Sequence, residues 1–163
     1  NMPTAKAVSA PAQDTTTTEA PTTEAPTTEA PTTEAPVTEA PTSDLGQQIA
    51  NFACQFVGNP YVWGGTSLTN GADCSGFVQS VYKNFGSALP RTCTPQSNGG
   101  TAVSSAALAR GDLVFYDHGT GSCEHVGIYI GNGQIVHASS SRTGIKISNV
   151  NYSTPFKACR IVN

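Results

Sequence analysis

A proline recurs every five residues through the first quarter of the chain, and this spacing limits where a folded core can form. Residues 15–41 repeat the pattern Thr-Thr-Glu-Ala-Pro, with prolines from Pro21 to Pro41. Each proline removes a backbone donor and pushes the preceding residue toward extended geometry, so no helix can run through the repeat. We therefore predict that residues 1–43 form a disordered Thr/Glu/Ala/Pro stalk and residues 44–163 form one folded domain.

Charge divides at the same boundary. The chain carries a net charge of −3, and residues 1–43 carry −5, which leaves +2 for residues 44–163. A nearly neutral domain without a basic run is a poor match for nucleic acid, so we predict no nucleic-acid partner. No stretch approaches about 18 consecutive apolar residues, and we predict no transmembrane segment. We expect the protein to be a monomer.

Five cysteines occur in the domain: Cys54, Cys74, Cys93, Cys123 and Cys159. They contain no C-x-x-C pair, so we predict neither a metal site nor a cofactor. If Cys74 is a free nucleophile, the other four can form two disulfides, as in extracytoplasmic proteins. Four cysteines allow three pairings, and buried free thiols are the alternative. Our preferred pairing joins Cys93 to Cys123 and Cys54 to Cys159, which leaves one free thiol.

The first part of the domain has helical periodicity. Apolar side chains spaced by four, three and four residues predict a helix over residues 44–57, with Ser43 or Asp44 as its N-cap. A glycine-rich loop over residues 58–71 separates this helix from a second one over residues 74–85, which Asp73 is placed to cap. In the long loop that follows, we expect a short helical piece near residues 104–108.

Strand-like segments occupy the rest of the domain. They cover residues 112–116, 125–130, 134–138, 144–149 and 156–162. The second of these alternates apolar side chains with histidine, glycine and tyrosine, which is typical of a strand with two different faces. Helices first and strands afterwards predict an α+β domain, with N-terminal helices packed on a mostly antiparallel sheet.

Cys74, His125 and His137 form the most informative pattern in the domain. Cys74 begins the second predicted helix, where the helix field and unpaired N–H groups lower a thiol pKa. His125 would complete a thiolate–imidazolium pair, and His137 would orient the ring of His125. The alternatives are a buried structural thiol at Cys74, a strand-edge residue at His125 and a satisfied core histidine at His137.

The turn between two strands decides whether the histidines can meet. A three-residue loop over Gly131–Gly133 pairs Ile128 with Val136 and places His125 and His137 on one face, about 7–8 Å apart at Cα. A two-residue turn would place the histidines on opposite faces. Because the first register also packs Ile128 against Val136, we predict the longer loop, a type I turn closed by its last glycine in the left-handed region.

Several ordered motifs lie within residues 48–162. They are Gly58-Asn59-Pro60-Tyr61-Val62-Trp63-Gly64-Gly65, Asp73-Cys74-Ser75-Gly76-Phe77-Val78, Leu89-Pro90-Arg91-Thr92, Gly111-Asp112-Leu113-Val114-Phe115, His125-Val126-Gly127-Ile128-Tyr129-Ile130-Gly131 and Ile135-Val136-His137-Ala138. Together, these motifs resemble the NlpC/p60 family of cell-wall endopeptidases. The resemblance implies a papain-like α+β fold and hydrolysis of peptidoglycan stem peptides, commonly between D-γ-glutamate and a diamino acid. It places the catalytic cysteine at Cys74, the base at His125 and the orienting residue at His137.

The same resemblance places a tyrosine near the reaction's oxyanion at Tyr61. Trp63 and Ser75 are further candidates for oxyanion or substrate binding, although Trp63 has an alternative role as a core aromatic. We interpret His118 as a solvated loop residue and Glu124 as a surface charge. Many relatives have residues other than cysteine at the positions of Cys93 and Cys123. A disulfide between these two cysteines would reshape the cleft.

These observations lead to the hypothesis of a secreted cysteine peptidase that works on peptidoglycan stem peptides at the cell wall. Two alternatives stay open from the sequence. One is a cysteine amidase or acyltransferase on the same fold, and the other is a catalytically inactive wall-binding module.

Overall fold

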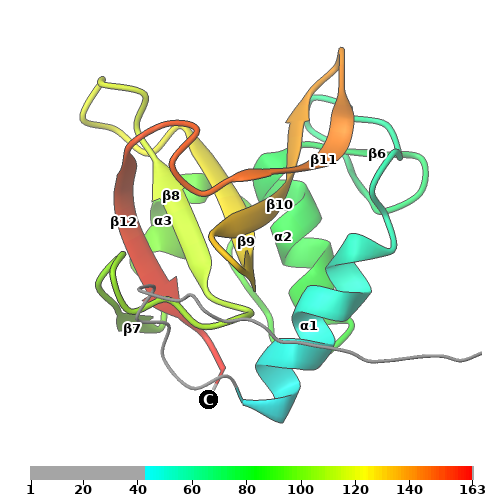
Figure 1. Cartoon of the computed structure of the whole chain (residues 1–163). Helices are drawn as coiled ribbons and strands as arrows, with labels where there is room; N and C mark the ends of the chain where they lie inside the picture. Colours follow the sequence, from blue (N-terminus) through cyan, green and yellow to red (C-terminus); the bar gives the residue numbers. More distant parts are fainter. Residues whose placement is uncertain (1–42, 163) are drawn as a thin grey trace, which may run out of the picture. The chain divides into compact units, whose positions relative to one another are not determined.

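The computed structural model describes residues 43–162 and shows helices beside an antiparallel sheet (Figure 1). The predicted stalk lies outside the described residues, except for Ser43, and stays a prediction. The helices are α1 (Asp44–Cys54), α2 (Cys74–Lys83) and α3 (Cys93–Ser97), and the strands are β5 (Thr66–Ser67), β6 (Gly71–Ala72), β7 (Thr101–Ala102), β8 (Leu113–Tyr116), β9 (His125–Gly131), β10 (Gln134–Ser140), β11 (Gly144–Asn149) and β12 (Pro155–Arg160).

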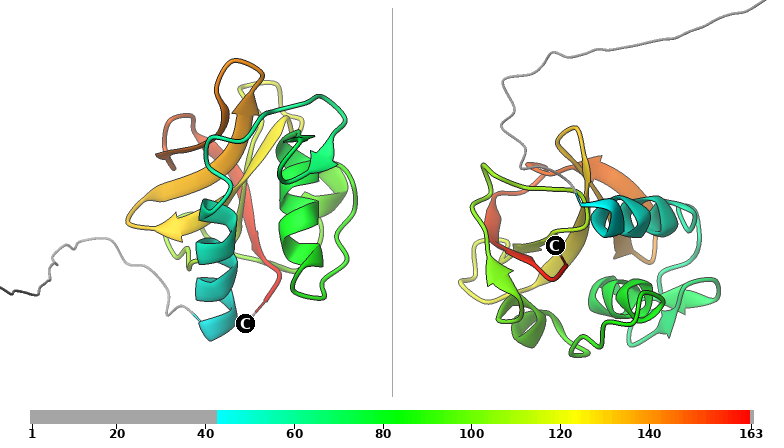
Figure 2. Two further views of the ribbon diagram at one scale, coloured as in Figure 1. Left: turned by 90° about the vertical axis from the view of Figure 1, so that its right-hand side faces the viewer. Right: turned by 90° about the horizontal axis from the view of Figure 1, so that it is seen from below.

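The main sheet has the strand order β11-β10-β9-β8-β12-β7, and every neighbouring pair is antiparallel. Helices α1 and α2 lie side by side against this sheet (Figure 2), and both contact β9. Strands β5 and β6 form a separate small pair in the loop before α2. The predicted α+β fold is therefore confirmed. Within residues 43–162, no helix has the length and apolar character that crossing a membrane requires.

Side-chain caps decide where the two long helices begin. Ser43 is the N-cap of α1, and its hydroxyl oxygen accepts the N–H of Gly46 at 3.0 Å. Asp73 caps α2 in the same way, through the N–H of Gly76 at 2.8 Å. Both helices end earlier than predicted. After α2, Gly86 takes a φ of 84°, which glycine adopts without strain and which turns the chain away from the helix axis.

The loop between α2 and β8 differs from the prediction. Residues 104–107 form a turn, in which the N–H of Ala107 donates to the carbonyl of Ser104, so the predicted helical piece near residues 104–108 is wrong. The short helix of this loop is α3, where Pro95 lies in the first turn and needs no donor of its own. Strands β5, β6 and β7 were also missed, because two residues are too few to show alternation.

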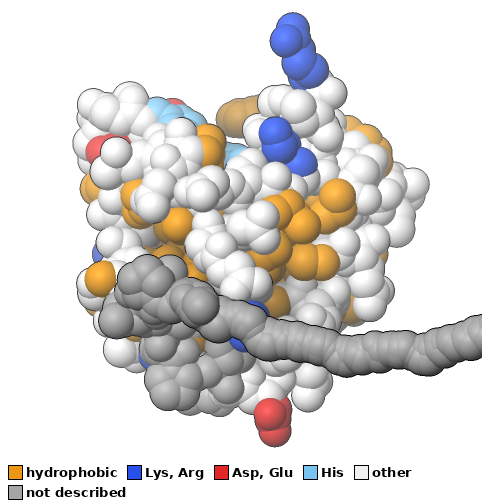
Figure 3. All heavy atoms as spheres, viewed as in Figure 1, with side chains coloured by type: hydrophobic (Ala, Val, Ile, Leu, Met, Phe, Trp, Pro, Cys, Tyr) orange, Lys and Arg blue, Asp and Glu red, His pale blue; other side chains and the backbone are white. Residues whose placement is uncertain are grey.

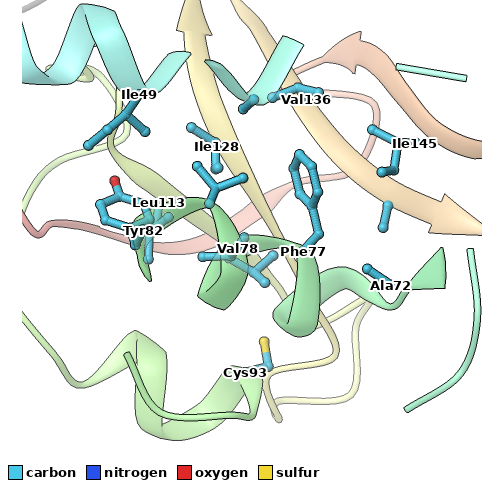
Figure 4. Close-up of a cluster of buried hydrophobic side chains, with 14 of the residues drawn as sticks. Ile49, Ala72, Phe77, Val78, Tyr82, Cys93, Leu113, Ile128, Val136 and Ile145 are labelled. Atoms are coloured by element: carbon cyan, nitrogen blue, oxygen red, sulfur yellow. The ribbon is translucent and has the colours of Figure 1, made fainter. Parts of the chain in front are cut away.

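A core fills the space between the helices and the sheet (Figure 4). Phe77 and Val78 of α2 pack there with Ile128 of β9 and Val136 of β10, and all four side chains are fully buried. Each such side chain stabilises the fold by roughly 1.5–3 kcal/mol through removal from water. Side chains that point to the other face of the sheet form a second buried cluster. This cluster contains Tyr129 and Ile135, the chain neighbours of Ile128 and Val136. This packing holds the first turn of α2 against the start of β9.

The hairpin between β9 and β10 has the predicted register but not the predicted loop. Only Asn132 and Gly133 lie in the turn, with φ angles of 56° and 74°, and this two-residue form is the one that Asn-Gly prefers. A β-bulge then adds one residue to β9, and beyond it Val136 faces Ile128. The bulge, rather than a longer loop, keeps both histidines on one face.

One disulfide occurs among the described residues, between Cys93 and Cys123, with a Cα–Cα distance of 5.9 Å. The proposed Cys54–Cys159 bridge is wrong, and so is the expectation of a single free thiol, because Cys54, Cys74 and Cys159 are all free. Cys54 ends α1, which packs against β9, whereas Cys159 lies in β12, on the far side of β8. The sheet order therefore separates the two thiols.

Thiol titration tests this arrangement. In denaturant without reductant, the protein should show three reactive thiols, and after reduction it should show five. The measurement is the absorbance released from DTNB. A variant in which both Cys93 and Cys123 are serine should show three thiols with or without reductant. A count of one thiol in the unreduced protein would support the second bridge and contradict the structure.

Candidate active site

Cys74 is the first residue of α2 and lines a cleft of about 730 Å³ between the start of α2 and the start of β9. His125 lines the same cleft as the first residue of β9. Because α2 packs against β9, the structure brings the predicted nucleophile and the predicted base into one cleft from distant parts of the chain. His137 lies behind His125 and is only 1% exposed.

The carboxylate of Asp73 organises the wall that presents Cys74. Its two oxygens accept the N–H groups of Gly76 and Gly64, at 2.8 and 3.0 Å, and both also accept from the guanidinium of Arg91 at 3.0 Å. Burial alone would raise the pKa of Asp73, but these donors hold that pKa below its usual range. Asp73 is thus a charged helix cap, and its interactions account for it without a role as a catalytic acid.

The expected lowering of the Cys74 pKa is not found. Burial of the thiol raises its pKa, and the nearby charge of Asp73 raises it further, while the backbone N–H of Val126 acts in the opposite direction. The carboxylate that caps α2 thus works against the helix field that favours a thiolate. In the free protein, the thiol of Cys74 therefore stays protonated around neutral pH.

His125 and His137 form a buried pair of imidazoles. Nε2 of His125 lies 2.6 Å from Nδ1 of His137, and the two rings meet edge to face with centroids 4.9 Å apart. Burial lowers the pKa of His125 to about 3, assisted by His137 and His118, and lowers the pKa of His137 to about 4, assisted by Lys146. Both rings are therefore neutral around neutral pH, and a neutral imidazole can accept a thiol proton.

Two further residues near this pair were missed from the sequence. Nε2 of His137 lies 2.8 Å from Oγ of Ser148 on β11. The ring of Tyr152 lies 5.3 Å from that of His137 and 6.5 Å from that of His125, by ring centroids. Neither position carries a sequence signal, since only the pairing of β11 with β10 and the loop after β11 bring them here.

His118 is an exposed loop residue, as interpreted from the sequence. It also lines the cleft and stacks on His125 with ring centroids 6.1 Å apart, which the sequence did not indicate. Figure 3 shows histidine side chains at the upper edge of the domain, over the loop between β8 and β9. Glu124 also lines the cleft from this loop. Sulfur atoms of Cys93 and Cys123 lie 3.4 and 4.0 Å from the carbonyl oxygen of His125, so the disulfide supports this wall.

The three substrate-side candidates all line the cleft. Trp63 is 86% exposed, which excludes its alternative role as a core aromatic. Ser75 is buried, and its hydroxyl bonds to Arg91 at 3.0 Å. Burial raises the pKa of Tyr61, and the charge that Cys74 can carry raises it further, so the phenol stays a neutral donor. Arg91, to which no role was assigned, lines the cleft beside Ser75.

The side chains present support acyl transfer through a thiol. The cleft brings together a thiol and a neutral imidazole, and a second imidazole behind the first can orient it, which is the arrangement of a cysteine hydrolase. Within residues 43–162, no group of three or more His, Cys, Asp or Glu side chains is placed to hold a metal ion.

Comparison with known proteins agrees with this geometry. The model of the NlpC/P60 family matches residues 58–162. A gamma-D-glutamyl-L-lysine dipeptidyl-peptidase of Bacillus cereus is 42% identical over 105 residues, or 63% of this chain. A gamma-DL-glutamyl hydrolase of Bacillus subtilis is 44% identical over 111 residues, or 67% of this chain. The crystal structure of the NlpC/p60 domain of the peptidoglycan hydrolase SagA superposes with a TM-score of 0.65 at 35% identity.

The extent of these matches identifies the shared unit. The alignments cover only 31% and 26% of the two Bacillus proteins. In contrast, the SagA match covers 97% of that chain and 71% of this one. The similarity therefore concerns one domain, which the two Bacillus proteins combine with further sequence.

Replacing Asp73 with asparagine should destabilise the domain in a pH-dependent way. The variant keeps a capping oxygen but loses the charge that pairs with Arg91, so the free energy of unfolding should fall by about 2 kcal/mol at pH 7. Because the folded pKa of Asp73 is lowered, this stabilisation is present above about pH 4 and is lost as the pH falls through the folded pKa.

Urea unfolding at pH 7 and pH 3 would measure the difference. The control is Asp44→Asn, which removes an exposed carboxylate from the first turn of α1. A gap between wild type and Asp73→Asn that is equal at both pH values would contradict the ion-pair argument.

Proposed function

Because the chain belongs to the NlpC/P60 family, we propose that its folded domain is a cysteine peptidase that hydrolyses the γ-D-glutamyl bond of peptidoglycan stem peptides. The observation that carries the proposal is that His125 lines the same cleft as Cys74 and lies 2.6 Å from the buried ring of His137. Two relatives have names that refer to a γ-glutamyl bond. They are a gamma-D-glutamyl-L-lysine dipeptidyl-peptidase and a gamma-DL-glutamyl hydrolase.

Attack on the peptide carbonyl begins from a neutral pair. The Sγ of Cys74 adds to the carbonyl carbon while its proton passes to Nδ1 of His125, the ring nitrogen that the bond to His137 leaves for this role. The thiol and the imidazole are both uncharged beforehand, because burial raises the pKa of Cys74 and lowers the pKa of His125. Proton transfer is thereby coupled to arrival of the substrate.

The remaining steps use the same groups. N–H groups in the first turn of α2, together with the Tyr61 hydroxyl, stabilise the oxyanion that forms on the carbonyl oxygen. The imidazolium of His125 then protonates the leaving amine, which departs and leaves a thioester on Cys74. Water, deprotonated by His125, hydrolyses the thioester and restores the thiol.

A γ-linked glutamate differs from an α-linked one by the free α-carboxylate that it keeps beside the peptide chain. Arg91 and Ser75 line the cleft next to Cys74, and the Arg91 side chain is 34% exposed. A guanidinium and a hydroxyl suit a carboxylate, so we assign this wall to the α-carboxylate of D-glutamate. Burial of Asp73 against the same guanidinium keeps Arg91 oriented toward the cleft.

The proposed location of this activity is the cell wall, outside the cytoplasm. The protein is secreted to reach it and acts there as a monomer. Peptidoglycan lies there, and the Cys93–Cys123 disulfide is a bond that oxidising compartments preserve.

Digestion of defined stem peptides tests the reaction. Wild type should release products of cleavage after γ-D-glutamate, identified by mass spectrometry, and Cys74→Ala should lower the rate by about 10⁴-fold or more. Cys54→Ala, which removes a free thiol at the end of α1, is the matched control and should keep full activity.

The choice of substrates sharpens the result. A peptide with an α-linked glutamate should resist cleavage. Poly-γ-glutamate serves as a second γ-linked substrate, and wild type should cleave it more slowly than the stem peptide. Cleavage that survives Cys74→Ala would overturn the proposal, and so would equal rates on the α- and γ-linked peptides.

Trp63→Ala should weaken substrate use without changing stability. Because Trp63 is 86% exposed at the cleft, its loss should leave the free energy of unfolding within about 0.5 kcal/mol of wild type. The loss of an aromatic contact should reduce kcat/KM for muropeptides by about threefold to tenfold. The control is Phe156→Ala, an exposed aromatic on β12. An unchanged kcat/KM in Trp63→Ala would exclude a substrate contact at this position.

A further inference from the structure

The buried ring of His137 uses both of its nitrogens. Nδ1 lies 2.6 Å from Nε2 of His125, and Nε2 lies 2.8 Å from Oγ of Ser148. The sequence pattern and the proposed mechanism account for the first contact only. The second contact places the half-buried hydroxyl of Ser148 at the end of a row of side chains that starts at Cys74 and continues through the two imidazoles.

The strand register explains why this serine reaches the ring. On the β10–β11 pair, His137 lies opposite Lys146, and Ser148 lies two residues further along β11. Side chains two residues apart in a strand share a face, so Ser148 is a diagonal neighbour of His137. The residue opposite Ser148 is Ile135, which is fully buried and has no polar atom for the hydroxyl.

Only one arrangement of protons lets His125 act as a base toward Cys74. A neutral imidazole carries one N–H and one lone pair. If Nδ1 of His125 is to receive the thiol proton, its Nε2 must carry the hydrogen and donate to Nδ1 of His137. The hydrogen of His137 must then lie on Nε2, where Oγ of Ser148 accepts it.

The opposite arrangement removes the base. If Ser148 donated its proton to Nε2 of His137, then Nδ1 of His137 would carry the hydrogen and donate to His125. The hydrogen of His125 would then lie on Nδ1, on the side of the nucleophile, and Cys74 could not transfer its proton there. The direction of the bond at Ser148 therefore selects between a competent and an incompetent site.

We propose that Ser148 is a positioning residue, whose Oγ accepts the Nε2–H of His137 and so holds His125 in the tautomer that can deprotonate Cys74. The proposal rests on the proposed function, which makes His125 the base. In the chemical step, the S–H bond of Cys74 breaks and an N–H bond forms at Nδ1 of His125. No proton moves along the rest of the chain, so Ser148 keeps its own hydrogen throughout.

Three substitutions separate this role from a general structural one. Ser148→Ala leaves the buried Nε2–H of His137 without its acceptor and should lower kcat by about tenfold, with little change in KM. Ser148→Thr keeps the hydroxyl and should restore activity. Ser148→Asp offers an acceptor that cannot donate, so it should also keep activity. Ser141→Ala, an exposed position in the β10–β11 turn, is the matched control.

Two readouts need no substrate. The rate at which iodoacetamide alkylates Cys74, identified by peptide mass spectrometry and followed against pH, reports proton transfer to His125. Long-range proton–nitrogen correlation NMR reports which nitrogen of each imidazole carries the hydrogen. Cys74 lines the same cleft as His125, and the other titratable groups that interact with the pair from other elements are Tyr116, His118, Lys146 and Tyr152. All of them are unchanged in these variants.

The expected result is an Nε2–H tautomer for both histidines in wild type, its loss in Ser148→Ala, and a parallel fall of about tenfold in alkylation near neutral pH. Ser148→Ala that alkylates like wild type with unchanged tautomers would overturn the proposal. Ser148→Asp as slow as Ser148→Ala would also overturn it. If alkylation depends on Ser148 while no stem peptide is cleaved, the positioning role stands and the proposed substrate fails.

Discussion

The carboxylate of Asp73 is the interaction on which the arrangement of the cleft depends. It caps α2, bonds the loop at Gly64 and pairs with Arg91, so three segments meet at one side chain. Gly76 must lack a side chain, because a Cβ there would collide with the carbonyl oxygen of Gly65. The loop, the helix start and the cationic wall are thereby locked together directly beside Cys74. A buried charge is stable here only because each of its oxygens has donors.

That arrangement has a chemical consequence. The carboxylate that builds the start of α2 also disfavours a thiolate at Cys74, and burial lowers the pKa of both His125 and His137. A site that rests in a neutral state relies on geometry rather than on a preformed ion pair. The orientation of two imidazoles then matters more than their charge, which is why a neutral hydroxyl at Ser148 can serve as the terminal partner.

Much of the fold was predictable because local patterns agreed with the tertiary structure. Spaced apolar residues and the capping side chains of Ser43 and Asp73 located both long helices, and strand-like apolar segments, one of them alternating, located the strands β8 to β12. The errors arose where local rules allowed two outcomes. Asn132 and Gly133 form a two-residue turn instead of the predicted longer loop. A β-bulge, which no local sequence pattern predicted, then restores the predicted pairing of Ile128 with Val136. The predicted Cys93–Cys123 disulfide is confirmed, but the predicted Cys54–Cys159 disulfide is wrong, because an even number of cysteines says nothing about the distance between two strands.

The sequence by itself identified the candidate catalytic residues, since a thiol at a capped helix start and two histidines flanking an Asn-Gly turn are local features. Only the tertiary structure decided how those groups behave. Burial raised the pKa of Cys74 and lowered the pKa of His125 and of His137, and the pairing of β10 with β11 supplied Ser148. Burial and strand pairing depend on residues far apart in the chain, and no local pattern records them.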